Sequence, residues 1–548
     1  MLTYTPPHEQ DLPPATEKPW LLLLLCLAWL LPGLLGLEPL KPDEPIVADI
    51  VRHFIDGHPL SLPMLAGEAW VERAPLFYWV ATGLAWLGQW LGLSLHEGAR
   101  LATGCFMALA LWGTGMTARE LIGRRHGRSA VLILIGCAGL LLPGHALTTD
   151  VVVLAGWCWG GYALALAPRR PYPAAAILGA ALATCGLAGS LAEPAMLLLL
   201  ALLLPLFRAW RFPRYGLVLL IALAIALPLV AAWPMALSHA SAAAYGQWRD
   251  HYALGFFGGF AQVQLGHPFG YYLRLLPWFA WPAWFLAAAT LWMQRERLMQ
   301  PRFQLPLVAA ALALLCLLLS NSGRAGYALL LLPPLAWIGA VGLDVLRRGA
   351  SAFVNWFGVM TFGLLALFLW VCWLAMHFGL PVRLSGRIQE LAPSFSPTFS
   401  ILALLLCLGF TLAWLWAVSR RRPVGRQAVT NWAAGITLCW GLAVLIAGNW
   451  VNARTSYRDF ARAIAPSLPK TGCIASENLQ ASQRAILHYY LGLSTLRREI
   501  HPNHGCDWLL RQGGSEALNP PPGWQLVWQG NRPGDRKERF YLYRQDAP

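Results

Sequence analysis

Residues 20–37 of the chain read WLLLLLCLAWLLPGLLGL, a stretch without a single charged residue. A run of about 20 apolar residues is long enough to cross a bilayer as a helix. Comparable runs recur to about residue 451, and 57% of the 548 residues are hydrophobic while only 12% are charged. Because a soluble domain carries about 25% charged residues, the composition excludes a soluble globular protein and predicts an all-α polytopic membrane protein.

The net charge of +15 comes from basic residues that gather in short clusters between the apolar runs. Lys and Arg collect in this way in the cytoplasmic loops of membrane proteins. There is no basic tail and no basic helix with interleaved aromatic residues, so we expect no nucleic-acid partner. If the N-terminus is cytoplasmic, all of these clusters fall on the cytoplasmic side: Arg119, Arg124, Arg125 and Arg128; Arg169 and Arg170; Arg208, Arg211 and Arg214; Arg295, Arg297 and Arg302; Arg347 and Arg348; and Arg420, Arg421, Arg422 and Arg426.

Because the basic clusters must all lie on the cytoplasmic side, the number of crossings between them is fixed as odd or even. This charge parity predicts about thirteen crossings in a bacterial inner membrane, with the C-terminus outside. It requires that residues 75–93, which hold Trp79, Trp86, Gln89 and Trp90, lie in the membrane interface instead of crossing it. The expected transmembrane domain is 1–451, with an outer loop at 38–97 that contains interfacial helices. The expected spans are residues 20–37, 98–118, 130–147, 151–167, 172–189, 194–207, 216–234, 276–294, 304–320, 326–346, 353–378, 399–418 and 430–451.

Residues 452–548 have an ordinary soluble composition and predict a small periplasmic α/β domain. The expected helices are at 457–464 and 482–491, and the expected strands are near 473–476, 524–528 and 540–543. Nine of the eleven Cys lie in apolar runs, and the other two, Cys473 and Cys506, lie in this domain. In an oxidising compartment these two could form a disulfide, but two buried free thiols would explain them equally well.

Charged residues beside membrane helices are energetically costly, so those outside the basic clusters are informative. Taken alone, each has a simple structural explanation; Asp150, for example, could cap the helix that follows it. The case for a functional site depends on their joint placement, because the topology puts all of the candidates at the outer face. They are Lys41, Asp43, Glu44, Glu72, Arg73, Asp150, His267, Arg324 and Tyr327.

The first outer loop carries a specific order of motifs. Asp43-Glu44 follow the first apolar run, Pro63 to Gly67 come next, and Glu72-Arg73-Ala74-Pro75 precede Tyr78-Trp79. This order resembles the group of lipid A aminoarabinose transferases (ArnT) and protein O-mannosyltransferases, which are membrane glycosyltransferases of the GT-C type. Weaker matches continue through most of the membrane part: Gly123-Arg124-Arg125, Asp150, Leu276-Pro277-Trp278 and Arg324-Ala325-Gly326-Tyr327.

Three positions depart from the pattern of this group. The group usually has Glu-Lys-Pro at Glu72-Arg73-Ala74-Pro75 and Lys near Arg324, and it often has Lys-Gly at Ala192-Glu193-Pro194. The resemblance therefore implies the broader class, a transferase that uses a polyprenyl-phosphate sugar, and not aminoarabinose as the donor sugar. The implied acceptor is lipid A or a protein, the implied displacement inverts the anomeric centre, and we expect a monomer in contact with membrane lipid.

The resemblance and the chemistry together give each candidate a role. A carboxylate can orient an acceptor and take its proton, which suits Asp43 with Glu44 beside it. Fixed cations stabilise a leaving phosphate, which suits Arg73 and Arg324 and, less directly, Lys41. Asp150 and Tyr327 are expected to position the substrate. Glu72 and His267 are candidate ligands of a divalent metal ion, the one cofactor that the sequence offers.

The main alternative is a transporter or lipid flippase for cell-envelope precursors. Such a protein would place ionisable residues near the bilayer midplane and would show repeated halves with broken helices. We find no internal repeat, and Glu193 beside Pro194 is the one candidate for a charge within a span. A non-catalytic assembly or anchoring subunit is a third reading.

Overall fold

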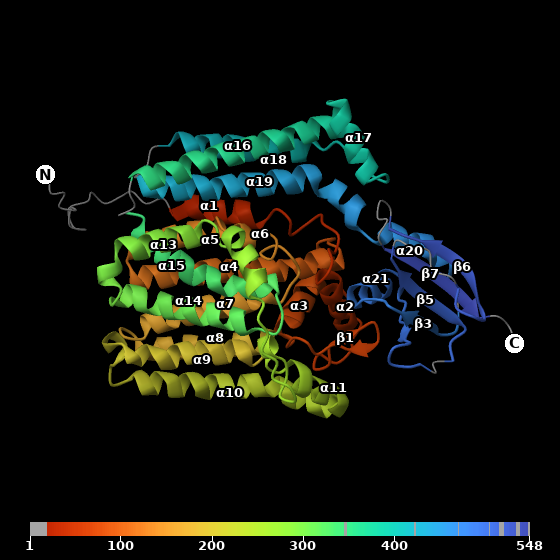
Figure 1. The fold of residues 1–548 in the computed structure, drawn as a ribbon, viewed down its shortest axis with the longest axis horizontal. Helices are drawn as coiled ribbons and strands as arrows, with labels where there is room; N and C mark the ends of the chain where they lie inside the picture. The colour runs from red at the N-terminus through yellow and green to blue at the C-terminus, as the bar shows by residue number, and fades with distance from the viewer. Residues whose placement is uncertain are drawn as a thin grey trace.

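A computed structural model describes residues 19–344, 348–420, 424–469, 471–502, 505–514, 520–532 and 538–545. Of the predicted basic clusters, Arg347, Arg421 and Arg422 lie outside the described residues. The helices lie side by side in a bundle, and a small sheet domain lies at one end of it (Figure 1). The end of the bundle that carries this domain is called the C-domain end below.

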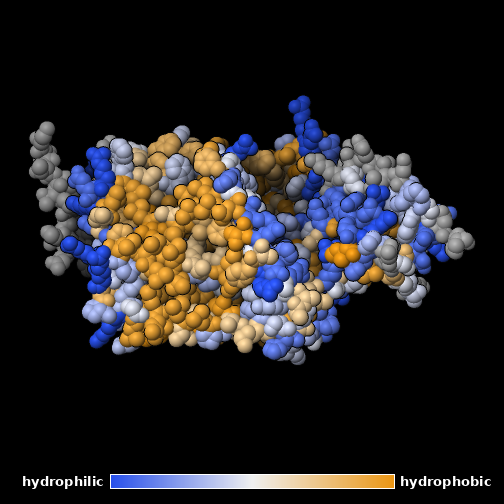
Figure 2. Space-filling model, turned by 60° about the horizontal axis from the view of Figure 1, so that its bottom comes forward, coloured by the Kyte–Doolittle hydropathy of each residue, from blue (hydrophilic) through white to orange (hydrophobic). Residues whose placement is uncertain are grey.

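Eight helical segments of the described chain are long and apolar enough to cross a membrane. Several remain largely uncovered by protein, since only 11% of the most apolar window of α18 and 22% of that of α10 are buried. Figure 2 shows the result, a broad apolar belt between two hydrophilic ends. Because water would not tolerate such a belt, lipid must cover it, and the chain is a multi-pass membrane protein. The segments are α4 (Leu95–Leu121), α8 (Pro171–Ala188), α10 (Tyr215–Ala240), α14 (Pro301–Leu319), η6 with α15 (Ala325–Gly342), α16 (Arg348–Phe378), α18 (Ile401–Ser419) and Gly425–Ser467, which contains most of α19 (Val424–Thr455).

The other predicted spans are helical but shorter or bent, so the count of thirteen is not confirmed. α12 (Phe269–Phe279) and α13 (Ala283–Met293) meet at 89° and make at most one broken span. Pro282 lies at this break, where its ring cannot continue a helix. α1 (Pro19–Leu30), α7 (Asp150–Leu166) and α9 (Ala192–Leu203) are short, and residues 130–147 divide between α5 (Arg124–Ile135) and α6 (Ala138–Leu141).

Residues 75–93 form α3 (Leu76–Trp90), whose 15 residues are too few for a crossing. At 1.5 Å per residue the helix is about 22 Å long, whereas the hydrocarbon core is about 30 Å thick. The helix packs closely on α4, because a Cβ at Gly98 of α4 would stand 2.8 Å from Ala85 Cα of α3. The length therefore suits the interfacial placement that the charge parity requires.

The C-terminal domain has the predicted α/β character. α20 (Arg458–Ile464), β3 (Ile474–Glu477), α21 (Ala481–Leu491), β6 (Trp524–Gly530) and β7 (Arg539–Gln545) lie where the sequence placed them, whereas β4 (Leu496–Arg497) and β5 (Trp508–Gly513) were not predicted. The strand order is β4-β3-β5-β7-β6, with β3 parallel to both of its neighbours. Cys473 and Cys506 form a disulfide, which ties the start of β3 to the segment before β5.

The first outer loop joins the two domains. It contains α2 (Glu44–Ile55) and a small hairpin, β1 (Met64–Leu65) with β2 (Glu68–Ala69). The buried Asp49 accepts hydrogen bonds from His488 Nδ1 at 2.5 Å and from the backbone N–H of Ala66 at 2.9 Å. Arg52 donates to the carbonyls of His488 and Tyr489 in the last turn of α21. The position of the loop is thus tied to the C-terminal domain.

Candidate active site

Two guanidinium and three carboxylate groups from separate parts of the chain meet at the C-domain end. Arg73 Nη1 lies 3.1 Å from Glu193 Oε1, and Arg73 Nη2 lies 3.4 Å from Asp150 Oδ1. Arg324 Nη2 lies 3.4 Å from Asp43 Oδ2 and 3.9 Å from Asp150 Oδ2. Asp150, which begins α7, therefore bridges the two arginines. These five side chains are called the charge cluster below.

The charge cluster has a buried base and an open rim. The side chains of Glu193, Arg73 and Asp150 are 2%, 8% and 11% exposed, whereas those of Arg324 and Asp43 are 32% and 48% exposed. Charges at the base satisfy one another, as buried charges must. The two groups at the rim are loosely paired and accessible, so they are the ones that a ligand could contact.

The surroundings change the proton affinity of these groups. Burial raises the pKa of Asp43, Asp150 and Glu44 act in the same direction, and Arg324 and Arg73 oppose them. Burial opposes the charge on Arg73, but Asp150 and Glu193 outweigh it and raise its pKa. Asp150 also raises the pKa of Arg324. The cluster therefore combines fixed cations with a carboxylate that holds its proton more tightly than an ordinary aspartate.

The local backbone leaves no spare room around the base. The backbone N–H and the hydroxyl of Ser190 both donate to Glu193 Oε2, at 2.8 and 2.5 Å. A Cβ at Gly189 would stand 2.7 Å from Glu193 Cδ, and one at Gly326 would stand 2.0 Å from Asp150 Oδ2. Glycine is therefore required at both positions for the carboxylates to reach the arginines.

Aromatic residues complete the surroundings of the rim. The Tyr327 ring lies 5.7 Å from the Arg73 guanidinium and 5.9 Å from that of Arg324, within the range of cation–π attraction. Phe256 packs edge-on against Tyr327 at 4.2 Å. The Tyr272 hydroxyl accepts from the backbone N–H of Arg324 at 3.3 Å and donates to its carbonyl at 3.2 Å. These contacts fix the backbone from which Arg324 extends.

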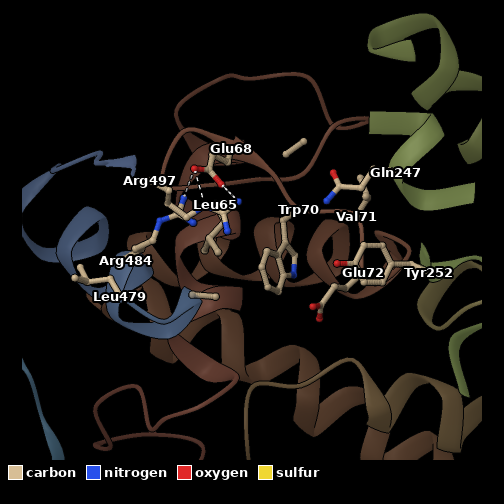
Figure 3. A pocket seen from close by; sticks show the side chains of 12 residues that line it. Leu65, Glu68, Trp70, Val71, Glu72, Gln247, Tyr252, Leu479, Arg484 and Arg497 are labelled. Atoms are coloured by element: carbon tan, nitrogen blue, oxygen red, sulfur yellow. Dashed lines mark hydrogen bonds and ion pairs between the residues drawn. The ribbon is translucent and has the colours of Figure 1, made fainter. Parts of the chain in front are cut away.

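Glu72 borders the charge cluster, whereas His267 does not. Burial raises the pKa of Glu72, while Arg324 and Arg73 oppose the shift, so its carboxyl lies within their influence. It also lines a pocket beside the cluster (Figure 3). His267 is exposed in the segment before α12, and it is not among the charges that act on Glu72. Within the described ranges no group of three or more His, Cys, Asp or Glu side chains could hold a metal ion.

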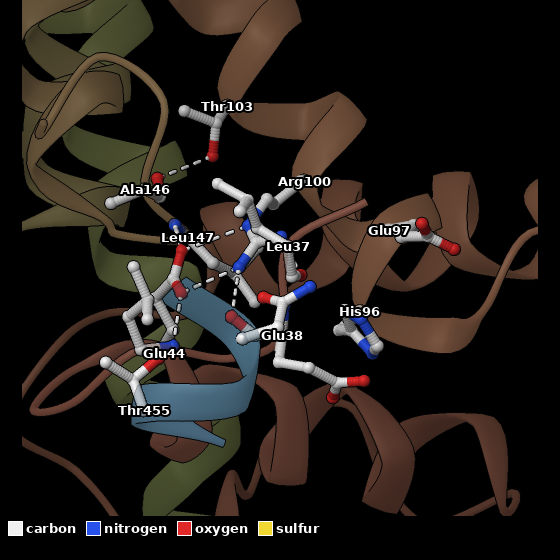
Figure 4. Close-up of polar contacts among 12 residues, drawn as sticks. Leu37, Glu38, Glu44, His96, Glu97, Arg100, Thr103, Ala146, Leu147 and Thr455 are labelled. Carbon is white, nitrogen blue, oxygen red and sulfur yellow. Dashed lines mark hydrogen bonds and ion pairs between the residues drawn. The ribbon is translucent and has the colours of Figure 1, made fainter. Parts of the chain in front are cut away.

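Glu44 and Lys41 engage other partners. Glu44 is buried and accepts from Arg100 Nε and Nη2 at 3.0 and 2.7 Å and from the backbone N–H groups of Leu40 and Leu147 at 2.6 and 2.8 Å (Figure 4). Lys41 Nζ lies 3.1 Å from both carboxylate oxygens of Glu538. The contacts of Lys41 and Glu44 thus fix the chain on both sides of Asp43.

Four of the five members of the charge cluster were candidates from the sequence, whereas Glu193 and the neighbouring Tyr272 were not. The structure brings together Asp43, Arg73, Asp150, Arg324 and Tyr327, all of which were candidates. Glu193 was noted only as a charge within a span, although a buried carboxylate already signals the need for a cationic partner. Tyr272 acts on the backbone of Arg324, and nothing in the sequence indicates that contact.

No protein-family model matches the chain, and no curated protein matches it by sequence. Among solved structures, ArnT from Cupriavidus metallidurans bound to undecaprenyl phosphate matches with a TM-score of 0.65 and 17% identity, over 96% of this chain and 98% of that one. The apo state of the same ArnT matches with a TM-score of 0.63 and 16% identity, over 95% and 97%. AglB from Archaeoglobus fulgidus, an oligosaccharyltransferase, has a TM-score of 0.49 and 11% identity, over 90% and 70%. The chain therefore has the fold of ArnT, the group that the motifs of its first outer loop resemble.

Proposed function

We propose that the protein is a glycosyltransferase that takes a sugar from a polyprenyl-phosphate carrier at the periplasmic face of the bacterial inner membrane. The observation that carries this proposal is the open rim, where the guanidinium of Arg324 and the carboxylate of Asp43 lie together at the end of a lipid-covered bundle. A structurally similar ArnT was crystallised with undecaprenyl phosphate, which supports a carrier lipid as the donor here. The acceptor is lipid A or a protein.

Arg324 is the proposed principal ligand of the donor phosphate. When the bond between the sugar and the phosphate oxygen breaks, negative charge grows on the phosphate, and a fixed guanidinium stabilises it. The distances of Arg324 from Asp43 and Asp150, 3.4 and 3.9 Å, leave its donors free to turn toward a phosphate. Arg73 supports it from the buried base. Lys41 is a third cation, available when Glu538 releases it.

Asp43 is the proposed group that orients the acceptor and takes its proton. Its raised pKa makes it a stronger base than an ordinary aspartate, which suits a hydroxyl acceptor. A single displacement of this kind inverts the anomeric centre. If the acceptor atom belongs to a phosphate, no strong base is needed, and Asp43 then only positions it. Asp150 and Tyr327 hold the arginines and the sugar in position relative to each other.

A divalent metal ion at Glu72 is a separate proposal. Its carboxylate faces a pocket and borders the charge cluster, where a cation would meet a favourable ligand. Transfer that is lost in EDTA and restored by Mg²⁺ or Mn²⁺ would support such an ion. Transfer at an unchanged rate in EDTA would remove metal from the mechanism.

The alternative function, a transporter or lipid flippase, loses its main support. Glu193 was the one residue that suggested a charge within a span, and it is neutralised by Arg73 at 3.1 Å as part of the charge cluster. A carboxylate held in this way belongs to the scaffold of the site. We therefore favour the enzyme.

Mass spectrometry of lipid A and of envelope glycoproteins, from cells with and without the protein, tests the proposed function. We expect one new sugar mass that depends on the protein and disappears in an Asp43→Asn variant. The matched control is Asp56→Asn in the same loop, because Asp56 is exposed and lies outside the charge cluster. An Asp43→Asn variant with full activity would remove Asp43 from the site, and the absence of any new mass would contradict the proposal itself.

A further inference from the structure

The polar pocket that Glu72 lines beside the charge cluster lies between the first outer loop and the C-terminal domain. Its volume is about 140 Å³. The outer loop contributes Glu68 and Glu72, the short helix η3 (Trp248–Tyr252) contributes Tyr252, and the C-terminal domain contributes Arg484 and Arg497 (Figure 3). The pocket therefore exists only where the two domains meet.

One side of this pocket holds two arginines and one glutamate. Arg497 Nε and Nη2 lie 3.1 and 2.7 Å from the two carboxylate oxygens of Glu68. Arg484 Nη2 lies 3.1 Å from Glu68 Oε1, so two guanidinium groups share one carboxylate. Figure 3 shows Glu72 on the opposite side of the pocket, away from this group. The two guanidinium groups on this side thus share the Glu68 carboxylate, and Glu499 acts on Arg484 from outside the pocket.

Arg484 indicates what is missing. Its side chain is 3% exposed and its Nη2 pairs with Glu68, yet in the described chain its buried Nε has no hydrogen-bond partner. A buried cation with unsatisfied donors is unfavourable unless an anion completes its surroundings.

We propose that this pocket is a second anion site, separate from the charge cluster, which holds a non-reacting phosphate of a glycolipid acceptor. This inference rests on the proposed function, because it assumes that an acceptor approaches the cluster. A guanidinium fork matches the oxygens of a phosphate. Glu72 lines the pocket and also borders the charge cluster, so a headgroup anchored at Arg484 and Arg497 would extend toward Asp43. The segment that carries Glu72 leads into α3, a helix of interfacial length, where lipid headgroups lie.

Equilibrium dialysis of the full-length protein in nanodiscs against radiolabelled inorganic phosphate tests the site. All variants carry Arg324→Gln, so that the charge cluster does not contribute. We expect Arg497→Gln to weaken binding about tenfold, the loss of one charged hydrogen-bonding group. Glu68→Gln should tighten binding, because it removes the competing carboxylate. Arg498→Gln is the matched control, since Arg498 Nη1 instead lies 3.1 Å from Glu477 Oε2. Equal binding by all variants would overturn the proposal.

Competition then identifies the source of the phosphate. Micelles of monophosphorylated lipid A should displace inorganic phosphate, whereas dephosphorylated lipid A should not. Displacement by a phosphopeptide but not by the lipid would overturn the glycolipid assignment. In a transfer assay, Arg497→Gln should raise the KM for the acceptor and leave the KM for the donor unchanged. If no sugar is transferred by any variant, the proposed function fails while the binding measurements still decide the pocket.

Discussion

At the scale of single residues, the protonation state of Asp43 controls the proposed sugar transfer. An aspartate whose pKa is raised by burial keeps its proton to a higher pH than the ordinary value of about 3.9. Because only the ionised form accepts a proton, we expect transfer to a hydroxyl acceptor to fall as the pH drops through that raised value. Asp150 contributes to the shift, so Asp150→Asn should move the falling limb to lower pH. The measurement is kcat/KM against pH, and a limb in the same place in both proteins would contradict the assignment.

The two arginines of the charge cluster should respond differently to substitution. Arg324 is at the rim, so Arg324→Gln should lower the transfer rate by about 10²–10³-fold with little change in stability. Arg73 is at the base, and Arg73→Gln leaves Glu193 buried without its partner, which costs about 3–5 kcal/mol. Transfer assays and thermal unfolding separate the two effects. Arg274→Gln on α12 is the control, because Arg274 is exposed. A large loss of stability in Arg324→Gln would contradict the assignment of Arg324 to substrate binding and Arg73 to structure.

Glu44 is expected to act through structure and not through chemistry. Glu44→Gln leaves the charge of Arg100 buried, so we expect a loss of about 3–5 kcal/mol in the free energy of unfolding. Replacing both residues by Met should recover part of that loss, since an apolar pair needs no partner charges. Thermal unfolding of the single and double variants measures both effects. A variant that unfolds like the native protein but transfers no sugar would instead make Glu44 catalytic.

At the scale of elements, η6 (Ala325–Leu331) approaches α7 only because its second residue has no side chain. Gly326→Ala would place a Cβ 2.0 Å from Asp150 Oδ2 and push Asp150 away from the arginines. Since a displacement of about 1 Å near reacting groups can cost about 10²-fold, we expect a fall in kcat of that order. Gly216→Ala in α10 is the control, because open space surrounds Gly216. Equal kcat values for the two variants would show that Asp150 tolerates the shift.

The elements that the sequence predicted correctly are those with a strong local signal. Long apolar runs gave α10, α16 and α18, because lipid-facing helices are apolar on all sides. The bend between α12 and α13 was missed, since a continuous apolar run does not reveal that a proline breaks it. β4 and β5 were missed because β4 has two residues and β5 has a short apolar run of three, Trp508 to Leu510, so their pairing with β3 is set by tertiary contacts.

At the scale of the whole molecule, charge parity anticipated that the candidates share one face, but not which of them touch. The positive-inside rule sorts loops by side, and it therefore grouped Asp43, Asp150 and Arg324. It could not separate Glu44 or Lys41 from this group, because their partners Arg100 and Glu538 are distant in sequence. Which side chain turns toward the cluster is decided by packing between domains, and that information is not local.

The contact between Lys41 and Glu538 joins residues that are 497 positions apart. The ribosome adds Glu538 only after Lys41 and all of the residues between them, so the loop that carries Asp43 cannot form this contact until the C-terminal domain has been made. A chain stopped after residue 451 is expected to insert into the bilayer and to transfer no sugar, which expression of the truncated gene with a sugar-transfer assay would measure. Protein synthesis itself thus delays the proposed sugar transfer, and we expect an incomplete chain in the membrane to be inactive.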